Sequence, residues 1–314
     1  MSDSSHVNHD GSGMIVGFGE NSVDLVLRLP HYPQPGAAMS KVAIGRRDVR
    51  AGGQVATTIA TCAGLGLPTR YLGAFGSDEH GAFIRDGLQR RGVDVSLAVQ
   101  RDGHNRYAVI LVDASHGERV VLWQRDARLA IAVSDVRPDW IAGATLVHVD
   151  ATDEPAAIAV ARLARQAGLE VTSDIDEVTE DTRTLLDAVT TPILAEHVPA
   201  ALTGESDVAQ ALRVLRRTHP GRLVVTLGSR GAAMLEGETY TQVAGCRVHA
   251  VDTTSAGDVF RGAFIYGLRR GERGVRLLQF ANAAAAIACT REGALDSVPT
   301  LQEVTALQSS VYGN

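Results

Sequence analysis

Short apolar runs alternate with segments of helical periodicity along most of the chain. Residues 14–19 and 70–75 have the pattern of buried strands, and residues 54–64 and 79–91 have the spacing of helices. The alternation resumes in the second half of the chain. The further strands predicted are 145–149, 169–174, 192–195 and 223–227, and the further helices are 154–166, 181–189, 256–270 and 275–290.

Two β-rich regions interrupt this alternation, near residues 21–52 and 95–130. In the second region, residues 107–112 and 118–123 flank a turn and predict a hairpin. Strands that alternate with helices predict a mostly parallel sheet covered on both faces. We therefore expect an α/β fold, a three-layer αβα sandwich over residues 14–314, with the β-rich regions forming a small β-sheet lid.

Composition narrows the classes of partner. The 314 residues include 30 basic and 36 acidic side chains, a net charge of −6 without long basic runs, and 45% are hydrophobic. This balance argues against nucleic acid or an anionic membrane as a partner. The longest apolar stretch, 280–289, is interrupted by Asn282 and is far shorter than the roughly 20 residues of a membrane helix. Residues 1–13 are polar and predict a disordered tail rather than a signal peptide.

Three widely separated cysteines, Cys62, Cys246 and Cys289, show no metal-ligand spacing. An odd number without pairs fits the reducing cytoplasm, where such residues are usually small buried apolar groups. We therefore expect a cytoplasmic protein.

The strongest chemical motif is the segment 252–258. Ser255, Ala256 and Gly257 are small residues at a predicted loop-to-helix junction, and Asp258 lies in the first helical turn. A helix start offers unpaired N–H groups and the positive end of a dipole, which together suit a phosphate. Asp258 beside that anion could accept a proton from an attacking hydroxyl. The alternative is structural: Ser255 caps the helix and Asp258 only complements its dipole.

A second motif lies nearer the N-terminus. Gly52 and Gly53 precede a helix of small residues, and paired glycines allow the backbone to approach a ligand. Asp24 follows the first strand and could accept hydrogen bonds from ligand hydroxyls. It could equally be an ordinary turn residue.

Together these motifs resemble the ribokinase family, the PfkB-type carbohydrate kinases, over about residues 14–299. The resemblance implies that Asp258 is the catalytic base and that the amides of Ala256, Gly257 and Asp258, which follow Ser255, form the anion hole. It implies a sugar site formed by Asp24, Gly52, Gly53 and Thr57, with Asp150 as a weaker candidate. The implied nucleotide-site residues are Thr226, Gly228, Ser229, Gly231 and Asn282.

The family also binds metal ions. The resemblance implies Mg²⁺ on the phosphates of ATP and a monovalent cation, K⁺, beside the anion loop. The implied ligands of the monovalent cation are Asp252, Thr254, Ala288, Gly293 and Ser297.

The chain departs from the family pattern at three places. Thr57 stands where many members carry Asn, which alters the expected sugar contact because Thr reaches less far. The Asn-x-x-Glu stretch that helps to organise magnesium is missing at 195–198, where Glu196 could substitute through water. Ser255 replaces the commoner Gly.

Other classes are less well supported. Gly17 and Gly19 suggest a dinucleotide fingerprint, but Ser22 stands at the third glycine, and no P-loop motif is present. His148 and His197 have no evident partner and are expected to be structural. The sequence thus predicts an ATP-dependent kinase that phosphorylates a hydroxymethyl group of a small sugar. The exposed edge of the lid could pair two subunits into a homodimer. A nucleoside kinase, or a non-catalytic sugar or nucleotide sensor, remains an alternative.

Overall fold

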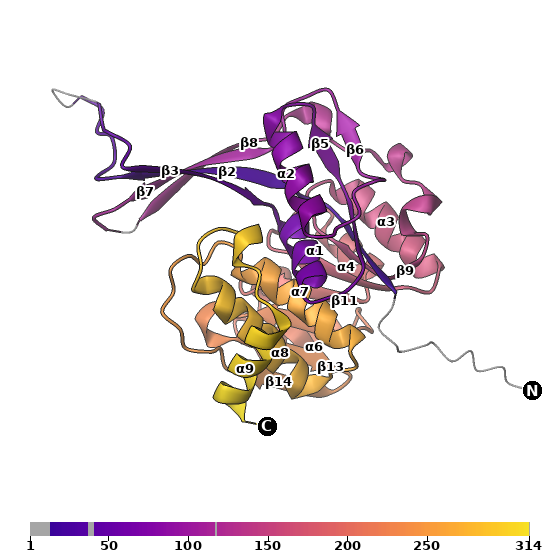
Figure 1. Ribbon diagram of the computed structural model, residues 1–314. Helices are drawn as coiled ribbons and strands as arrows, with labels where there is room; N and C mark the ends of the chain where they lie inside the picture. The colour runs from indigo at the N-terminus through magenta and orange to yellow at the C-terminus, as the bar shows by residue number, and fades with distance from the viewer. Residues whose placement is uncertain (1–12, 37–40, 117, 314) are drawn as a thin grey trace, which may run out of the picture.

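An eight-stranded sheet forms the centre of the computed structural model, which describes residues 13–36, 41–116 and 118–313 (Figure 1). The tail expected over residues 1–13 lies outside the described residues, apart from Gly13. Neighbouring strands are parallel except where β13 takes part, as an antiparallel partner of both its neighbours. Across the sheet the strands are β14 (Thr239–Val243), β13 (Ala232–Glu236), β12 (Leu223–Thr226), β11 (Thr191–Ala195), β10 (Glu170–Ile175), β9 (Ala144–Val149), β1 (Met14–Phe18) and β4 (Thr69–Leu72).

Helices cover both faces of this sheet. Side chains along β1 alternate between two cores, with Ile15 in one and Val16 and Phe18 in the other, as a parallel strand buried on both faces requires. The first core holds α1 (Gln54–Gly64), α2 (Glu79–Arg90), α7 (Ala256–Arg269), α8 (Gly274–Cys289) and α9 (Leu301–Tyr312). The second holds α3 (Glu154–Gln166), α4 (Thr182–Ala188), α5 (Val198–Thr203) and α6 (Val208–Arg216). The predicted αβα sandwich is confirmed.

A separate four-stranded sheet projects from this body, at the upper left of Figure 1. Its order is β3 (Arg46–Gly52), β2 (Ser22–Leu29), β7 (Tyr107–Asp113) and β8 (Arg119–Gln124). β7 and β8 are antiparallel neighbours, so the predicted hairpin is confirmed, although Gly117 of its turn lies outside the described residues. β2 joins the two β-rich regions by pairing antiparallel with β3 and parallel with β7.

The single strand predicted at 70–75 is wrong, because the chain divides there into two strands. β4 ends at Leu72, and β5 (Ala74–Gly76) pairs instead with β6 (Val99–Arg101). Gly73 lies at the break, where a Cβ would stand 2.1 Å from the Tyr71 hydroxyl and 2.6 Å from the Gly19 carbonyl oxygen. Tyr71 donates a hydrogen bond to that carbonyl, and only glycine leaves room for it.

The remaining described segments are short 3₁₀ turns and loops. The turns are Ala127–Leu129, Val133–Asp135, Pro138–Ile141, Gly228–Arg230 and Leu295–Ser297. No helix in the described part of the chain combines the length and apolar character that a membrane span requires.

Candidate active site

Acidic residues gather where neighbouring parallel strands end. Asp150 follows β9, Asp174 lies near the end of β10, and Asp176 follows it. Carboxyl ends of parallel strands meet at one edge of a sheet, where α/β proteins usually bind their ligands. The N-terminus of α7 brings Asp258 to the same place, because Arg261, one turn farther along α7, contacts both Asp174 and Asp258.

The start of α7 has the features of an anion site. Ala256 donates its N–H to the Thr253 carbonyl oxygen at 3.3 Å, whereas helix geometry leaves the amides of Gly257 and Asp258 without partners inside the helix. Ser255 does not cap this helix with its side chain. Its hydroxyl lies 3.3 Å from the Gly293 carbonyl oxygen and 2.8 Å from the Ser297 hydroxyl. The free amides therefore remain available for a ligand.

The environment of Asp258 makes its carboxyl a stronger base. Burial is the main cause that raises its pKa well above the ordinary value, and the charges of Asp174, Asp176 and Asp150 act in the same direction. The positive charge of Arg261 opposes these effects and lowers the pKa of Asp258, because its Nη1 lies 4.0 Å from Asp258 Oδ1. A carboxyl with a raised pKa, beside an anion-binding helix start, can accept a proton from a hydroxyl.

Asp24 and the paired glycines lie together at the base of the small sheet. Asp24 is on β2, and Gly52 ends β3, where a Cβ would stand 3.5 Å from Asp24 Oδ2. Gly53 has a φ of 99°, and a Cβ there would lie 2.4 Å from the Cα of Asn21, so this position requires glycine. Thr57 is fully buried on α1, and its hydroxyl has no hydrogen-bond partner among the described residues. Asp24 thus lies close to Gly52, and Gly53 packs against Asn21, which directly precedes β2.

Asp150 is fully buried and supports the chain around it. Its carboxylate accepts hydrogen bonds from the backbone N–H groups of Glu20 at 2.8 Å and Thr152 at 2.9 Å. Burial raises its pKa to about 7. These contacts favour a role in shaping the loop after β1 over a direct contact with a sugar.

All five residues expected at the nucleotide site line one pocket. Thr226 is the last residue of β12, Gly228, Ser229 and Gly231 follow it, and Asn282 lines the same pocket from α8. Asn282 donates from Nδ2 to the carbonyl oxygens of Val243 and Ala244, which fixes the wall of the pocket. Ala256 and Gly257 line the same pocket, which therefore reaches the start of α7.

Most of the oxygens expected to bind a monovalent cation lie on the other side of that helix start. The Asp252 carboxylate accepts from the N–H and hydroxyl of Thr254 and from the N–H of Gly293. Ser297 is fully buried and bonds to Ser255. Ala288 lies in the last turn of α8, where its carbonyl oxygen accepts from the N–H of Arg291. The donor set is oxygen throughout, which suits a hard cation.

Glu196 stands apart from the other candidates. It follows β11, its side chain is half exposed, and it forms an ion pair with Arg230. No group of three or more metal-ligating side chains is found within the described residues. Of the two histidines expected to be structural, His148 is fully buried and bonds through Nδ1 to the Thr172 hydroxyl.

The structure adds residues to the site that the sequence did not single out. Gln54 donates from Nε2 to Asp176 at 2.6 Å, and both line a cleft together with Arg106, which directly precedes β7, and Trp123 of β8. Gln54 directly follows Gly53, so its place in the double-glycine motif was the available signal. Arg106 belongs to no sequence motif, and its position just before β7 places it at this cleft.

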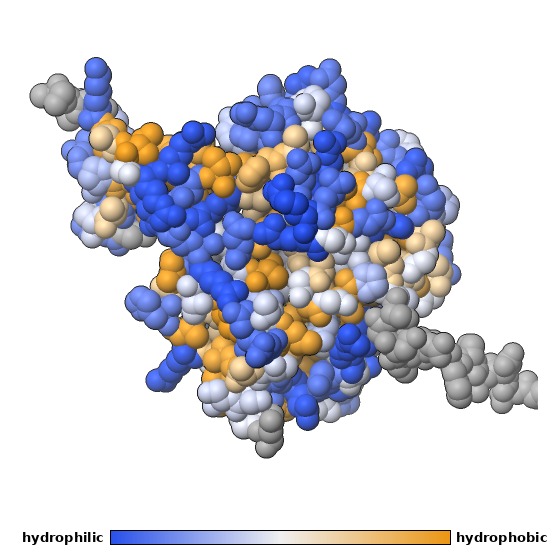
Figure 2. All heavy atoms as spheres, in the orientation of Figure 1, coloured by the Kyte–Doolittle hydropathy of each residue, from blue (hydrophilic) through white to orange (hydrophobic). Residues whose placement is uncertain are grey.

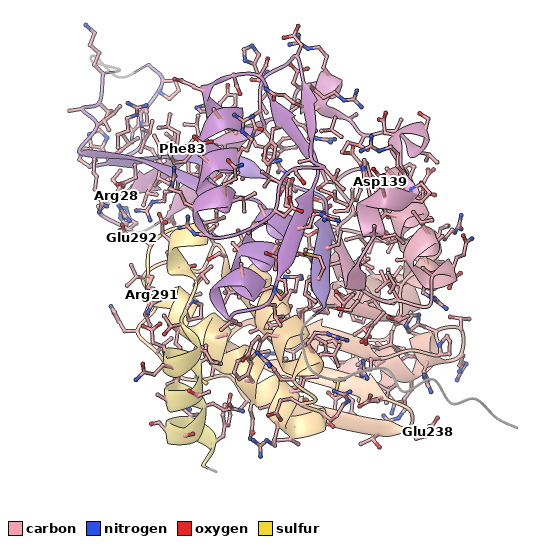
Figure 3. All side chains as sticks on the ribbon, turned by 45° about the vertical axis from the view of Figure 1, so that its right-hand side comes forward. Arg28, Phe83, Asp139, Glu238, Arg291 and Glu292 are labelled. Carbon is pink, nitrogen blue, oxygen red and sulfur yellow. The ribbon has the colours of Figure 1, made fainter. Side chains whose placement is uncertain are left out.

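A second set of contacts joins the small sheet to the loop after α8. Glu292 accepts hydrogen bonds from Arg28 at 2.7 Å, Arg46 at 3.0 Å and Arg50 at 2.5 Å. Figure 3 shows Arg28 and Glu292 side by side where the two parts meet. Figure 2 shows the notch that remains between the projecting sheet and the lower half of the body. The cleft lined by Asp24, Arg28, Arg50, Arg119, Asp252 and Gly293 lies between these parts.

Comparisons with known proteins agree with this geometry. The chain is 27% identical over 285 residues to 5-dehydro-2-deoxygluconokinase of Shouchella clausii, covering 82% of this chain and 85% of the relative. It is 25% identical over 308 residues to ribokinase of Haemophilus influenzae, covering 91% and 95%. Arabidopsis thaliana ribokinase complexed with ribose and ATP matches in structure with a TM-score of 0.81 at 26% identity, covering 95% of this chain and 99% of that chain.

A family model described as pfkB family carbohydrate kinase matches residues 14–301. That match spans both sheets, the double-glycine motif and the start of α7. The chain therefore belongs to the pfkB family of carbohydrate kinases.

Proposed function

We propose that this kinase transfers the γ-phosphoryl group of ATP to a hydroxymethyl group of a small sugar, with Asp258 as the general base. The observation that carries the proposal is the position of the α7 start. Gly257 lines the nucleotide pocket, and the adjacent Asp258 lies near the acidic edge of the sheet, where it shares Arg261 with Asp174. A phosphoryl group on the amides of α7 would thus have the base beside it.

In this mechanism the acceptor hydroxyl gives its proton to Asp258 as its oxygen attacks the γ-phosphorus. The bond from that phosphorus to the β,γ-bridging oxygen breaks, and ADP leaves. The amides of Gly257 and Asp258 and the dipole of α7 stabilise the charge on the transferring group. Asp24, Gly52 and Gly53 bind the sugar from the side of the small sheet, which acts as a lid and excludes water.

Magnesium, when bound with the nucleotide, neutralises phosphate charge. Glu196 is the carboxylate nearest in sequence to the missing family motif, but it is paired with Arg230. We therefore assign the ion mainly to the phosphates of ATP, as Mg²⁺ sites commonly are.

A monovalent cation fits the oxygen set of Asp252, Gly293 and Ser297, and potassium is the ion proposed. When bound, it would add positive charge beside the anion-binding loop. The hydroxyl of Ser255 already bonds to the Gly293 carbonyl oxygen and the Ser297 hydroxyl, so the ion would share these oxygens with it.

We also propose that the kinase is a homodimer through the small sheet. β8 pairs with β7 alone among the described strands, so its other edge is unpaired, and its side chains include the exposed Val120, Val121, Leu122 and Trp123. Figure 2 shows apolar surface on this projecting sheet. An unpaired apolar edge is suited to pairing with a second copy.

The experiment that tests the function measures ADP release with ATP and magnesium against pentoses, hexoses, ketoses, deoxy sugars and nucleosides. A sugar that raises ADP release well above the sugar-free rate, with one phosphate added to it, supports the proposal. A response to nucleosides alone would make the enzyme a nucleoside kinase. Binding of ATP and sugar without turnover would make it a sensor.

A further inference from the structure

Arg261 is a buried cation at the centre of the acidic site. It lies on α7 one turn after Asp258 and is 4% exposed. Its Nη2 forms an ion pair with Asp174, which is 1% exposed, and its Nη1 lies 4.0 Å from Asp258 Oδ1. A guanidinium is costly to bury unless charges pair with it, and here two carboxylates do so.

The same guanidinium lies directly against the anion-binding loop. A Cβ on Gly257 would stand 2.5 Å from Arg261 Nη1, so Nη1 packs on the bare α-carbon of that glycine. Gly257 also lines the nucleotide pocket. The positive charge of Arg261 therefore lies just behind the amides of the α7 start.

We propose that Arg261 is a positioning residue for phosphoryl transfer, one that aims the Asp258 carboxylate at the acceptor and places a fixed positive charge behind the anion-binding amides. This inference rests on the proposed role of Asp258 as the base. Asp174 acts with Arg261 as its anchor on β10.

Electrostatics explain why the site needs such a cation. Three other carboxylates act on Asp258 through their charges. Asp174 and Asp176 lie at the end of β10, and Asp150 lies at the end of β9. Their charges favour the protonated form of Asp258, which cannot act as a base. Arg261 is the cation that opposes them, and arginine stays charged at any pH of interest.

The geometry also explains why the residue is arginine. One planar fork reaches Asp174 with Nη2 and Asp258 with Nη1, whereas the single ammonium group of lysine is a point charge. Nε of Arg261 has no hydrogen-bond partner among the described residues. The guanidinium is thus held by its two terminal nitrogens.

The test compares Arg261→Met, Arg261→Lys and Asp258→Asn, with Arg270→Met as the matched control. Arg270 is exposed at the end of the same helix and stacks over Tyr266, away from the carboxylates. For each variant, kcat, KM for ATP and sugar, the pH profile of kcat/KM and the melting temperature are measured.

Arg261→Met should lower kcat on the order of tenfold to a hundredfold, with KM values changed by less than about threefold. The acidic limb of the pH profile of kcat/KM should move to higher pH in this variant, because the cation that favours ionised Asp258 is gone. Arg261→Lys keeps the charge without the fork, so its kcat should lie between that of the wild type and that of Arg261→Met, with a smaller shift of the limb. Arg270→Met should change neither.

An unchanged kcat and acidic limb in Arg261→Met would overturn the inference. If that variant does not fold, the lysine variant decides, and wild-type kcat with a wild-type limb in Arg261→Lys would overturn it. Asp258→Asn separates the two claims. If it abolishes turnover while the Arg261 variants behave as wild type, only the inference fails, whereas full turnover in Asp258→Asn removes the proposed base itself.

Discussion

Arg119 donates a hydrogen bond from Nη1 to Oγ1 of Thr254 across 2.8 Å, joining the small sheet to the loop that enters α7. The Thr254 hydroxyl bonds in turn to Asp252 at 2.6 Å, and the charge of Arg119 helps to lower the pKa of that carboxyl. A strand of the proposed lid thus contacts the loop that leads into the proposed anion site at the start of α7.

Arg119→Met should therefore raise KM for the sugar several-fold, because the small sheet loses a contact that holds it over the site. The melting temperature should change little, since exposed polar contacts contribute little to stability. Steady-state kinetics and thermal unfolding check both parts. Arg276→Met is the control, because it removes an exposed arginine of α8 that pairs with Glu272 just before the helix. A KM no different from the control would show that the contact does not hold the lid.

Leu122→Glu should convert the proposed dimer into a monomer. Leu122 is 55% exposed on the edge strand β8, which pairs with β7 on one side only, and a charge there would lie in the interface with any strand of a second copy that pairs with β8. Light scattering measures the mass against the 33.2 kDa chain. Val275→Glu, at an exposed position on α8, should leave the mass unchanged. A wild-type protein that is already monomeric would contradict the proposal.

Sugar binding should weaken as the pH falls through about 6. Burial raises the pKa of Asp24 to about 6, so below that pH the carboxyl is protonated and loses its capacity as an ionised acceptor for sugar hydroxyls. The dissociation constant for the sugar, measured by calorimetry from pH 5 to 8, should rise on the acidic side. Asp24→Asn should bind weakly at every pH, without that inflection. An inflection that persists in this variant would assign the titration to another group.

Potassium should raise turnover above the level seen with sodium at the same ionic strength. The cation is proposed to bind the oxygens of Asp252, Gly293 and Ser297, and Na⁺ is too small to reach as many of them. Ser255→Gly removes the hydroxyl that bonds to two of these oxygens and should enlarge the potassium effect. Equal turnover in both salts, in both proteins, would show that hydrogen bonds inside the loop take the place of the ion.

The predicted architecture came from local patterns that the structure preserves. Strands such as 145–149 are apolar because both faces of the sheet are covered, and glycines and small residues marked the double-glycine turn and the start of α7. The helix α6 was not predicted, although the sequence shows an N-cap at Asp207 followed by buried apolar residues at helical spacing, Ala211, Leu212 and Leu215.

Other features depend on contacts between distant parts of the chain. Gly73 breaks a strand because Tyr71 bonds to Gly19 from the neighbouring strand. Arg261 is a polar residue within an apolar helix segment, and its partner Asp174 lies far earlier in the chain, on another element. No periodicity relates such a pair, so the buried ion pair could be found only from the fold.

The central claim is that Asp258 acts as the base, and the kcat of Asp258→Asn, measured with the binding of ATP and sugar to the same variant, tests it most directly. The amide keeps the shape of the side chain but cannot accept the proton. We expect kcat to fall on the order of a hundredfold or more, with both dissociation constants nearly unchanged. A variant that keeps wild-type turnover would contradict the account.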